Sequence, residues 1–553
     1  MKSPIFIVGG GHAGVEAALA ISRLKQKCVI VTMDKMALGR MSCNPAIGGL
    51  AKSHLVHEID ALGGIMSVAA DACGLQYKTL NMSKGRAVRS LRIQTDKKKY
   101  PKFIANIISK DKNISVLEGE VVSFKVYNSQ VSSVSMSNGE NYNCSSLIIT
   151  SGTFLSGLIH IGNKSFRAGR FGEASSLGLT ETLKNFGFSL GRLKTGTPPR
   201  VLKSSIDWSK TTPVSGDVSP TPFSLFRSSF DLSNNAPSHS VSTNSFVHEV
   251  LLENINQSPM YSGSIDAVGP RYCPSVEDKV VRFSDENSHS LFLEPEWKNS
   301  DQIYLGGFST SMPESVQLKA LRLISGLEKV ELIRPGYAIE YDFIPTYQLK
   351  SSLESKNIRN LFFAGQINGT SGYEEAAAQG LIAGINAHLK SHNKKPFVLP
   401  VTSSYIAAMI DELVTNERQE PLRVTTSSSE FRLILRNDNA EERLTPIGYK
   451  LGLIKSERYN KVIFAMNQVE IEISNLNKHI VKPNKRNLAI LESLGSSHIN
   501  KPISMAQLLA RSEIKYEHAI EFGYRSDFDL KHRLALEVRL KYSVFINKFF
   551  SAV

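Results

Sequence analysis

The opening of the chain constrains the fold more strongly than any other feature. IFIV (5–8) is an apolar, β-branched run typical of a buried strand, and VEAALA (15–20) is typical of a helix. Between them stands the glycine-rich segment GGGHAG (9–14). Gly9 permits a tight turn, Gly11 lets the backbone approach a pyrophosphate, and Gly14 lets helix and strand pack closely. The opening therefore predicts a strand–turn–helix unit that binds a dinucleotide.

A second strand and three later segments indicate which dinucleotide. CVIVT (28–32) is typical of a strand, and Asp34 lies twenty residues after Gly14, where either a ribose-binding carboxylate or an ordinary surface aspartate can stand. SLIITSGT (146–153) and NLFFAGQ (360–366) are buried-strand patterns that end in small residues, and EEAAAQG (374–380) opens another helix. A nucleotide fold that resumes so far along the chain is typical of FAD oxidoreductases with an inserted domain. The pattern favours FAD over the NAD of a simple dehydrogenase.

The chain divides into four stretches. We expect an α/β fold with a Rossmann-like FAD-binding domain in two parts, 1–200 and 336–395, and an inserted α/β domain at 201–335. An all-α domain at 401–553 is expected from helical patterns such as 405–414 and 534–549. Residues 201–245 are rich in Ser, Thr and Pro, which predicts a long loop or an irregular insertion.

Composition is typical of a globular cytoplasmic protein. With 41% hydrophobic and 21% charged residues over 553 positions, a disordered chain is excluded and two or three domains are expected. No window holds the roughly 18 apolar residues of a membrane span, and no basic lead precedes the first strand, so a signal peptide is not expected. Five scattered cysteines predict reduced thiols.

Positive charge is concentrated in one segment. The chain carries +14 at neutral pH, and between positions 78 and 113 eleven basic residues face two acidic ones, a local excess of nine. Such a block favours an anionic partner such as nucleic acid, while a solvated helix face is the plainer interpretation. Charge alone leaves both open.

Six motifs spread over most of the chain carry a resemblance to one family. They are MSCNPAIGG (41–49), NMSKGRAVR (81–89), GRLKTGTPPR (191–200), GPRYCPS (269–275), RPGYAIEYD (334–342) and GQINGT (365–370). Together they resemble the hallmarks of the MnmG (GidA) family, whose members modify uridine in tRNA. Chains of that family usually continue beyond the helix that ends here near Val553, so a shortened C-terminus is expected.

The resemblance implies a function, cofactors and partners. It implies a cytoplasmic FAD protein, usually a homodimer, that works on tRNA with the GTPase MnmE. Together they add a carboxymethylaminomethyl or aminomethyl group to carbon 5 of the wobble uridine. Methylenetetrahydrofolate supplies the one-carbon unit, glycine or ammonium supplies the amine, and NADH reduces the flavin. In this frame the basic segment, including Lys97, Lys98 and Lys99, is expected to line part of the tRNA path.

The resemblance also assigns binding residues by motif. FAD would be held by Gly9, Gly10, Gly11, His12, Ala13, Gly14, Val121, Ser176 and Gln366. NAD would be held by Gly269, Pro270, Arg271, Tyr272, Cys273, Pro274, Ser275, Val276, Glu277, Asp278, Lys279, Val280, Val281, Arg282 and Phe283.

Two cysteines are candidate catalytic nucleophiles. Carbon 5 of uracil is a poor nucleophile, and a thiolate that adds at carbon 6 would create an enolate able to attack a one-carbon unit. Cys43 follows Arg40, and Cys273 follows Arg271, so both thiols have a cation nearby in sequence. Glu374 or Glu375 could orient the cofactor or relay protons, although a glutamate at a helix start is often a partner of the helix dipole.

Two other functions stay open at this point. One is a folate- and FAD-dependent tRNA uridine methyltransferase, which usually lacks both the long insertion and the helical C-terminal region. The other is a degenerate flavoprotein that binds tRNA without catalysis.

Overall fold

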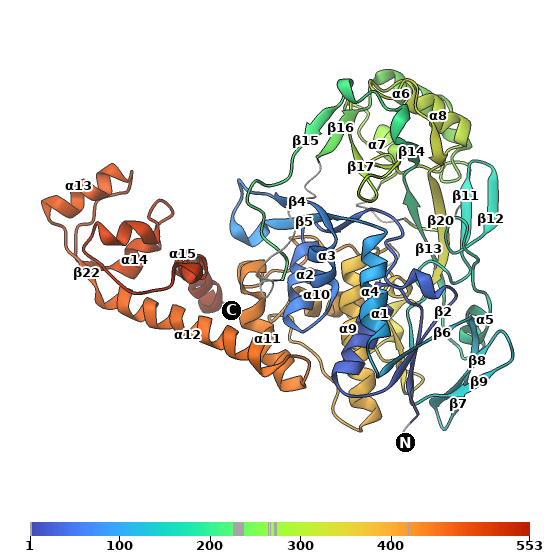
Figure 1. The fold of residues 1–553 in the computed structure, drawn as a ribbon, viewed down its shortest axis with the longest axis horizontal. Helices are drawn as coiled ribbons and strands as arrows, with labels where there is room; N and C mark the ends of the chain where they lie inside the picture. The colour runs from blue at the N-terminus through green and yellow to red at the C-terminus, as the bar shows by residue number, and fades with distance from the viewer. Residues whose placement is uncertain are drawn as a thin grey trace.

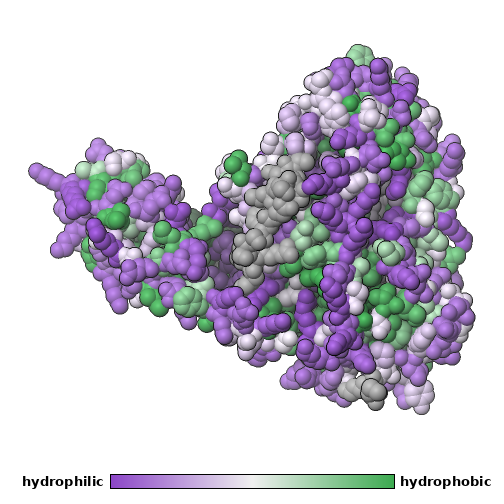
Figure 2. Space-filling view, in the orientation of Figure 1, coloured by the Kyte–Doolittle hydropathy of each residue, from purple (hydrophilic) through white to green (hydrophobic). Residues whose placement is uncertain are grey.

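The computed structural model describes residues 3–224, 237–263, 265, 267–269, 274–417 and 420–552. A large α/β body carries a helical arm that projects from one side, and the amino terminus lies at the lower edge of the body in this view (Figure 1). In the view of Figure 2 the arm presents mostly hydrophilic side chains with scattered apolar ones. Among the described residues, no helix is both long enough and apolar enough to cross a bilayer.

A five-stranded parallel sheet forms the centre of the nucleotide domain. Its strand order is β21-β10-β1-β2-β6, and each neighbouring pair is parallel. The strands are β1 (Ile5–Val8), β2 (Cys28–Thr32), β6 (Ile114–Glu118), β10 (Ser146–Ile149) and β21 (Leu361–Phe363). Because β21 pairs with β10, the sheet is completed by a strand that comes late in the chain. The inserted region begins after β10 and ends before β21, which is the neighbour of β10 in the sheet.

Two helices with small residues pack closely beside this sheet. They are α1 (His12–Arg23) and α9 (Tyr373–Ser391), which lie next to each other in Figure 1. A Cβ atom at Gly380 would lie 2.0 Å from the carbonyl oxygen of Ala13, and one at Gly384 would lie 2.6 Å from that of Ala17. The glycines therefore let the two helix backbones touch, which anchors the second part of the domain on the first.

Smaller elements surround the central sheet. The helices are α2 (Lys52–Ala61), α3 (Met66–Ala72), α4 (Lys99–Ser109) and α5 (Gly178–Asn185). One three-stranded sheet contains β3 (Ala46–Gly48), β4 (Gly74–Leu80) and β5 (Ser90–Thr95), and another contains β7 (Val121–Tyr127), β8 (Gln130–Met136) and β9 (Asn141–Asn143).

Two antiparallel sheets are built from residues between β10 and β21, and the strands of the first lie outside the predicted insertion at 201–335. One has the order β12-β11-β20-β13, from β11 (Leu158–Ile161), β12 (Lys164–Arg167), β13 (Gly191–Thr197) and β20 (Tyr337–Phe343). The other, β15-β16-β17-β18-β14-β19, contains β14 (Arg200–Leu202), β15 (Thr212–Val214), β16 (Ser238–Ser242), β17 (Ser290–Pro295), β18 (Gln302–Gly306) and β19 (Leu332–Arg334). Helices α6 (Ser245–Glu253), α7 (Val276–Arg282) and α8 (Glu314–Leu321) accompany it.

The prediction of an irregular stretch over 201–245 is wrong in part. Its residues supply β15 and β16, and β15 is an edge strand of the six-stranded sheet. Pro213 is tolerated in β15 because an edge strand has only one neighbour, so no second strand needs the N–H that proline lacks. Polar strands of this kind show little apolar alternation, which explains why the sequence pattern hid them. Residues 225–236 lie outside the described residues.

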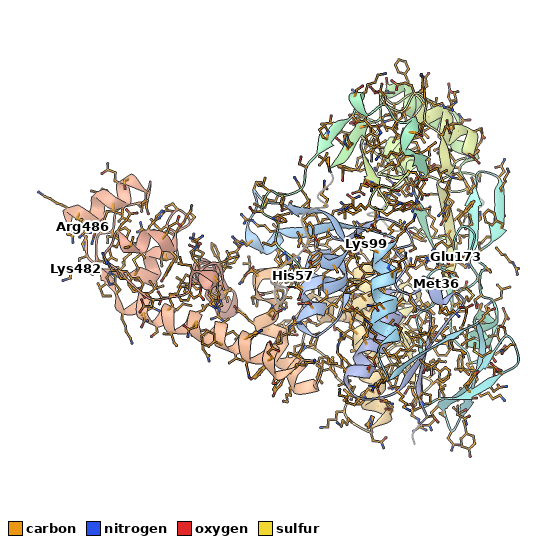
Figure 3. The ribbon with its side chains drawn as sticks, viewed as in Figure 1. Met36, His57, Lys99, Glu173, Lys482 and Arg486 are labelled. Atoms are coloured by element: carbon orange, nitrogen blue, oxygen red, sulfur yellow. The ribbon has the colours of Figure 1, made fainter. Side chains whose placement is uncertain are left out.

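The carboxyl-terminal region is helical apart from one short ladder. Its helices are α10 (Tyr405–Thr415), α11 (Ala440–Leu451), α12 (Ser456–Lys478), α13 (Lys485–Ser493), α14 (Met505–Leu509) and α15 (Arg533–Ala552). The ladder pairs β22 (Ile480–Val481) with β23 (Ile503–Ser504). The two helices predicted from periodicity are confirmed as α10 and α15. Figure 3 labels Lys482 and Arg486 near the tip of the arm.

Ion pairs join the arm to the body where α11 packs against α2. Arg458 donates through Nη2 to Asp60 Oδ2 and to Glu441 Oε1, each at 2.6 Å. Arg443 Nη1 lies 3.0 Å from Glu58 Oε1, and the Asp60 and Glu58 carboxylates are buried. The arm is therefore held by buried charge as well as by packing.

The basic β4–β5 hairpin also contacts the helical region. The hydroxyl of Tyr542 on α15 accepts from the backbone N–H of Ala87 at 3.3 Å, and Asn437 Nδ2 donates to the carbonyl of Arg89 at 2.8 Å. On the other side, the imidazole of His54 on α2 bonds the carbonyl of Ala87 at 3.1 Å. The motif at 81–89 is thus fixed between α2 and the arm.

The buried imidazole of His54 should make the folded protein less stable in acid. Burial lowers its pKa from 6.5 to about 4, so its contribution is present above pH 6.5 and is lost as pH falls through 4. Between neutral pH and pH 5 the wild type should lose about 2 kcal/mol that His54→Gln does not lose. Urea unfolding at the two pH values measures this difference. His498→Gln, which changes an exposed histidine, should keep the full wild-type slope, and an unchanged slope in His54→Gln would contradict the prediction.

Candidate functional site

A cavity of about 670 Å³ opens at the carboxyl ends of the parallel strands. Eight of the nine residues predicted to hold FAD line it: Gly9, Gly10, Gly11, His12, Ala13, Val121, Ser176 and Gln366. The structure thus brings together residues from the first turn, from β7, from the segment before α5 and from the turn after β21. The ninth, Gly14, lies behind the turn rather than in the cavity wall.

The glycine turn has the geometry that its sequence predicts. Gly9 has φ +107°, a conformation that favours glycine. A Cβ atom at Gly14 would lie 1.9 Å from the carbonyl oxygen of Gly9, whereas one at Gly11 would meet nothing within 4 Å. Gly14 therefore serves close packing of helix on strand, and Gly11 keeps the space above the turn open.

Several buried polar atoms of this cavity lack a hydrogen-bond partner within the described parts of the chain. They are His12 Nε2 and the hydroxyls of Ser151, Ser176 and Ser371. Burial lowers the pKa of His12 to about 3, with a further contribution from Arg170, so its imidazole is neutral near pH 7. Buried polar atoms without partners are costly, so the cavity suits a large ligand with many polar groups. The residues present fit a dinucleotide.

Asp34 stands at the end of β2, where the ribose carboxylate was predicted. It lines the cavity, but its Oδ1 also accepts from the Met36 N–H at 2.8 Å and its Oδ2 pairs with Arg40 at 2.7 Å. Arg40 in turn pairs with Glu173 at 3.0 Å. Figure 3 labels Met36 and Glu173 near each other on the right of the body. Arg40 is therefore engaged by two carboxylates, and its activation of Cys43 stays a prediction.

Cys43 lines the same cavity and has different cations beside it. Its Sγ lies 3.8 Å from Thr197 Oγ1 and 3.9 Å from the hydroxyl of Tyr304. Its carbonyl oxygen accepts from Arg200 Nη2 at 2.7 Å and from Lys97 Nζ at 3.2 Å. Burial lowers the pKa of Lys97 to about 8, although Glu296 opposes the shift. The sequence motif at 191–200 contained Thr197 and Arg200, but no local signal pointed to Lys97 as a neighbour of Cys43 or to Glu296 as the partner of both cations.

Glu374 and Glu375 open α9 at the edge of the cavity. Glu374 Oε1 accepts from the Gly48 N–H at 2.7 Å, and Glu375 forms a buried ion pair with Lys52. Burial raises the pKa of Glu374. Glu374 lines the cavity, so it is the better placed of the two for the predicted proton relay.

The segment predicted to bind NAD divides between several environments. Gly269, Pro274, Ser275, Asp278 and Arg282 line a second cavity of about 340 Å³, which shares Thr195 and Gly196 with the first. Val276, Glu277 and Val280 are buried, Val281 and Phe283 are exposed, and Lys279 Nζ donates to the carbonyl of Gly307. Pro270, Arg271, Tyr272 and Cys273 lie outside the described residues.

Part of the positive charge of the basic segment is paired with carboxylates inside the protein. Lys97 pairs with Glu296 at 2.6 Å and Arg92 with Glu294 at 2.6 Å, so neither is a free surface cation. The expectation that Lys97 faces tRNA is therefore wrong. The exposed cations of the segment are Lys84, Lys98, Lys99, Lys102, Lys110 and Lys112. Figure 3 labels Lys99 at the start of α4.

Comparisons with known proteins agree over nearly the whole chain. The family model described as Glucose inhibited division protein A matches residues 4–395, and the model for the tRNA modifying enzyme MnmG/GidA C-terminal helical domain matches residues 456–548. The chain is 46% identical over 548 residues to the tRNA uridine 5-carboxymethylaminomethyl modification enzyme MnmG of Thermodesulfovibrio yellowstonii, covering 98% of this chain and 87% of that protein. The corresponding enzyme of Syntrophotalea carbinolica is 44% identical over 550 residues, which cover 99% of this chain and 88% of the relative.

A solved structure shares the fold. GidA of Aquifex aeolicus, in its form II crystal, superposes with a TM-score of 0.91 at 39% identity, over 99% of this chain and 88% of that one. The predicted α/β class with a helical carboxyl-terminal region is confirmed, and so is the resemblance drawn from the six motifs. The chain belongs to the MnmG/GidA family of tRNA uridine modification enzymes.

Proposed function

We propose that this chain uses FAD to add a carboxymethylaminomethyl or aminomethyl group to carbon 5 of the wobble uridine in tRNA. The MnmG/GidA family consists of FAD-dependent enzymes that modify uridine in tRNA. The observation that carries the proposal is the position of Cys43, whose thiol lies in the wall of the cavity that the glycine turn opens. This shared cavity supports a nucleophile that acts beside a bound dinucleotide.

FAD would occupy the larger cavity, and when bound it would supply electron transfer, with NADH as its reductant. Gly9 to Ala13 would face its pyrophosphate at the start of α1, and Ser151, Ser176 and Ser371 have free hydrogen-bonding capacity for its polar groups. NADH as reductant would enter through the second cavity, beside Ser275, Asp278 and Arg282. The shared wall at Thr195 and Gly196 supports this arrangement.

Cys43 would act as the nucleophile. Its sulfur adds to carbon 6 of uracil, and the electron pair of the 5,6 double bond moves to carbon 5 and oxygen 4 as an enolate. The methylene of methylenetetrahydrofolate would pass to the amine of glycine or to ammonia as an iminium ion, with release of tetrahydrofolate. Carbon 5 then attacks the iminium carbon, and the electron pair of its carbon–nitrogen π bond moves to nitrogen. Loss of the proton from carbon 5 and of sulfur from carbon 6 restores the double bond. Cys273 remains the second candidate thiol.

The partners complete the proposal. On the strength of the family resemblance we infer a homodimer in the cytoplasm that acts with the GTPase MnmE.

The purified protein should be yellow, and NADH should bleach the yellow colour of its flavin. Mass spectrometry of wobble nucleosides, with and without this protein and the GTPase, should show carbon-5 derivatives that depend on both. A 5-methyluridine product, or no new nucleoside, would contradict the proposal in favour of the methyltransferase or the inactive flavoprotein. Cys43→Ser should abolish the product and Cys144→Ser, which changes a buried thiol next to β10, should not.

Exposed lysines of the basic segment should contact tRNA phosphates. We expect Lys99→Glu with Lys102→Glu to weaken tRNA binding and to lower the slope of log affinity against log salt by about one for each phosphate that the variant no longer neutralises. Lys394→Glu with Lys395→Glu makes the same change of charge at exposed sites after α9 and serves as control. Equal tRNA affinity and equal salt slopes for the two double variants would remove this surface from the tRNA path.

A further inference from the structure

A buried ion cluster lies directly behind Cys43, where the nucleotide domain meets the inserted region. Arg200 begins β14 and is 1% exposed, and Glu296 follows β17 and is 3% exposed. Glu296 Oε1 accepts from Arg200 Nε at 3.2 Å and from Lys97 Nζ at 2.6 Å. Burial alone would raise the pKa of Glu296, but Lys97 and Arg200 lower it. The cluster therefore holds two cations against one carboxylate, an excess of one positive charge beside the cavity wall.

Both cations of this cluster also reach the backbone of Cys43. Arg200 Nη2 and Lys97 Nζ donate to its carbonyl oxygen, at 2.7 Å and 3.2 Å. The N–H of Cys43 donates to the hydroxyl of Tyr373 at 2.6 Å. The peptide groups on both sides of the Cys43 Cα are thus held by side chains from three separate segments, which fixes the backbone from which the thiol projects.

Thr197 links the cluster to the sulfur itself. Its Oγ1 accepts from Arg200 Nη1 at 2.6 Å and lies 3.8 Å from Cys43 Sγ. A guanidinium can only donate hydrogen bonds, so Arg200 occupies a lone pair of Thr197 Oγ1. The hydroxyl proton of Thr197 therefore stays free to point toward the sulfur of Cys43. A hydroxyl polarised by a cation is a better donor, and it sits where negative charge gathers when a thiol reacts.

We propose that Arg200, Lys97 and Thr197 are positioning residues for Cys43: the two cations fix its backbone, and Thr197 offers its sulfur a hydrogen bond during reaction. The excess positive charge of the cluster complements a sulfur that has lost its proton. This inference rests on the proposed function, in which Cys43 is the reacting thiol. Arg200 and Lys97 act through the backbone and through Thr197, so neither needs to touch the substrate.

Alkylation of Cys43 in the FAD-loaded protein without tRNA tests the proposal. Iodoacetamide labelling from about pH 6 to pH 9, followed by mass spectrometry of the Cys43 peptide, gives a rate and a pH profile. Thr197→Val keeps the side-chain shape but removes the hydroxyl. It should slow labelling at neutral pH about tenfold and move the profile to higher pH, whereas Thr197→Ser should restore both. Arg200→Lys should act in the same direction, because an ammonium cannot reach all four acceptors of the guanidinium, which are Glu296 Oε1, Thr197 Oγ1 and the carbonyls of Pro198 and Cys43.

A neighbouring lysine supplies the matched control. Lys97→Met should slow labelling of Cys43, whereas Lys98→Met should not, because the ammonium of Lys98 lies over the Trp297 ring instead. Wild-type labelling rates and pH profiles in both Thr197→Val and Arg200→Lys would overturn the proposal. So would slowed labelling with an unchanged kcat for tRNA modification. Absence of tRNA modification by the wild type contradicts only the proposed function, since the labelling contains no tRNA.

Discussion

Gly14→Ala should yield a protein that neither folds stably nor binds FAD, whereas Gly11→Ala should fold normally and lose only FAD. The reason is the difference in space at the two positions. A methyl group at Gly14 would overlap the carbonyl oxygen of Gly9 at 1.9 Å and press on Thr150 Oγ1 at 3.1 Å, and neither backbone can move without opening the turn. We expect a loss of about 3 kcal/mol of folding free energy.

The two glycine variants control each other. At Gly11 a methyl group meets no protein atom, so urea unfolding of the apoprotein should match the wild type, while a flavin fluorescence titration should show weaker binding. A wild-type unfolding midpoint in Gly14→Ala would contradict the close packing of α1 on β1. Wild-type FAD affinity in Gly11→Ala would contradict the position of the pyrophosphate above the turn.

Arg458→Met should destabilise the junction between arm and body by about 3–5 kcal/mol, because it leaves Asp60 buried without its cation. Glu441 can take up a proton when its partner is removed, since burial already raises its pKa to about 7. Asp60 therefore accounts for most of the effect. Denaturant unfolding measures the loss, and limited proteolysis should release the arm from the variant first.

An exposed ion pair on the same helix provides the comparison for Arg458. Lys461 pairs with Glu457 at 2.8 Å, but both side chains are more than half exposed. Lys461→Met should therefore change stability by no more than about 0.5 kcal/mol. If Arg458→Met lost no more stability than Lys461→Met, the buried carboxylate at the junction would not depend on its arginine.

The nucleotide frame could be predicted from sequence because its signals are local. Gly9, Gly11 and Gly14 lie within six positions, and their spacing alone fixes the turn and the packing behind it. The apolar runs at 146–149 and 361–363 are similarly self-contained, and both are strands of the central sheet.

The surroundings of Cys43 could not be predicted in the same way. Arg40 is near the thiol in sequence, yet Asp34 and Glu173 bind it, while Lys97 and Arg200 approach from positions far along the chain. Which cation faces a thiol depends on the packing of the inserted region against the nucleotide domain. Sequence neighbourhood carries no information about such contacts.

The pairing of β10 with β21 has a consequence for how the protein is made. A ribosome releases Ser146 long before Leu361, and at about 5–20 residues per second the interval lasts some tens of seconds. Throughout that time the edge of β10 has no neighbour on one side, and the wall of the cavity that contains Gln366 does not yet exist. A ligand of this cavity can therefore be bound only late in synthesis, and the nascent chain carries an open strand edge on β10 until β21 pairs with it.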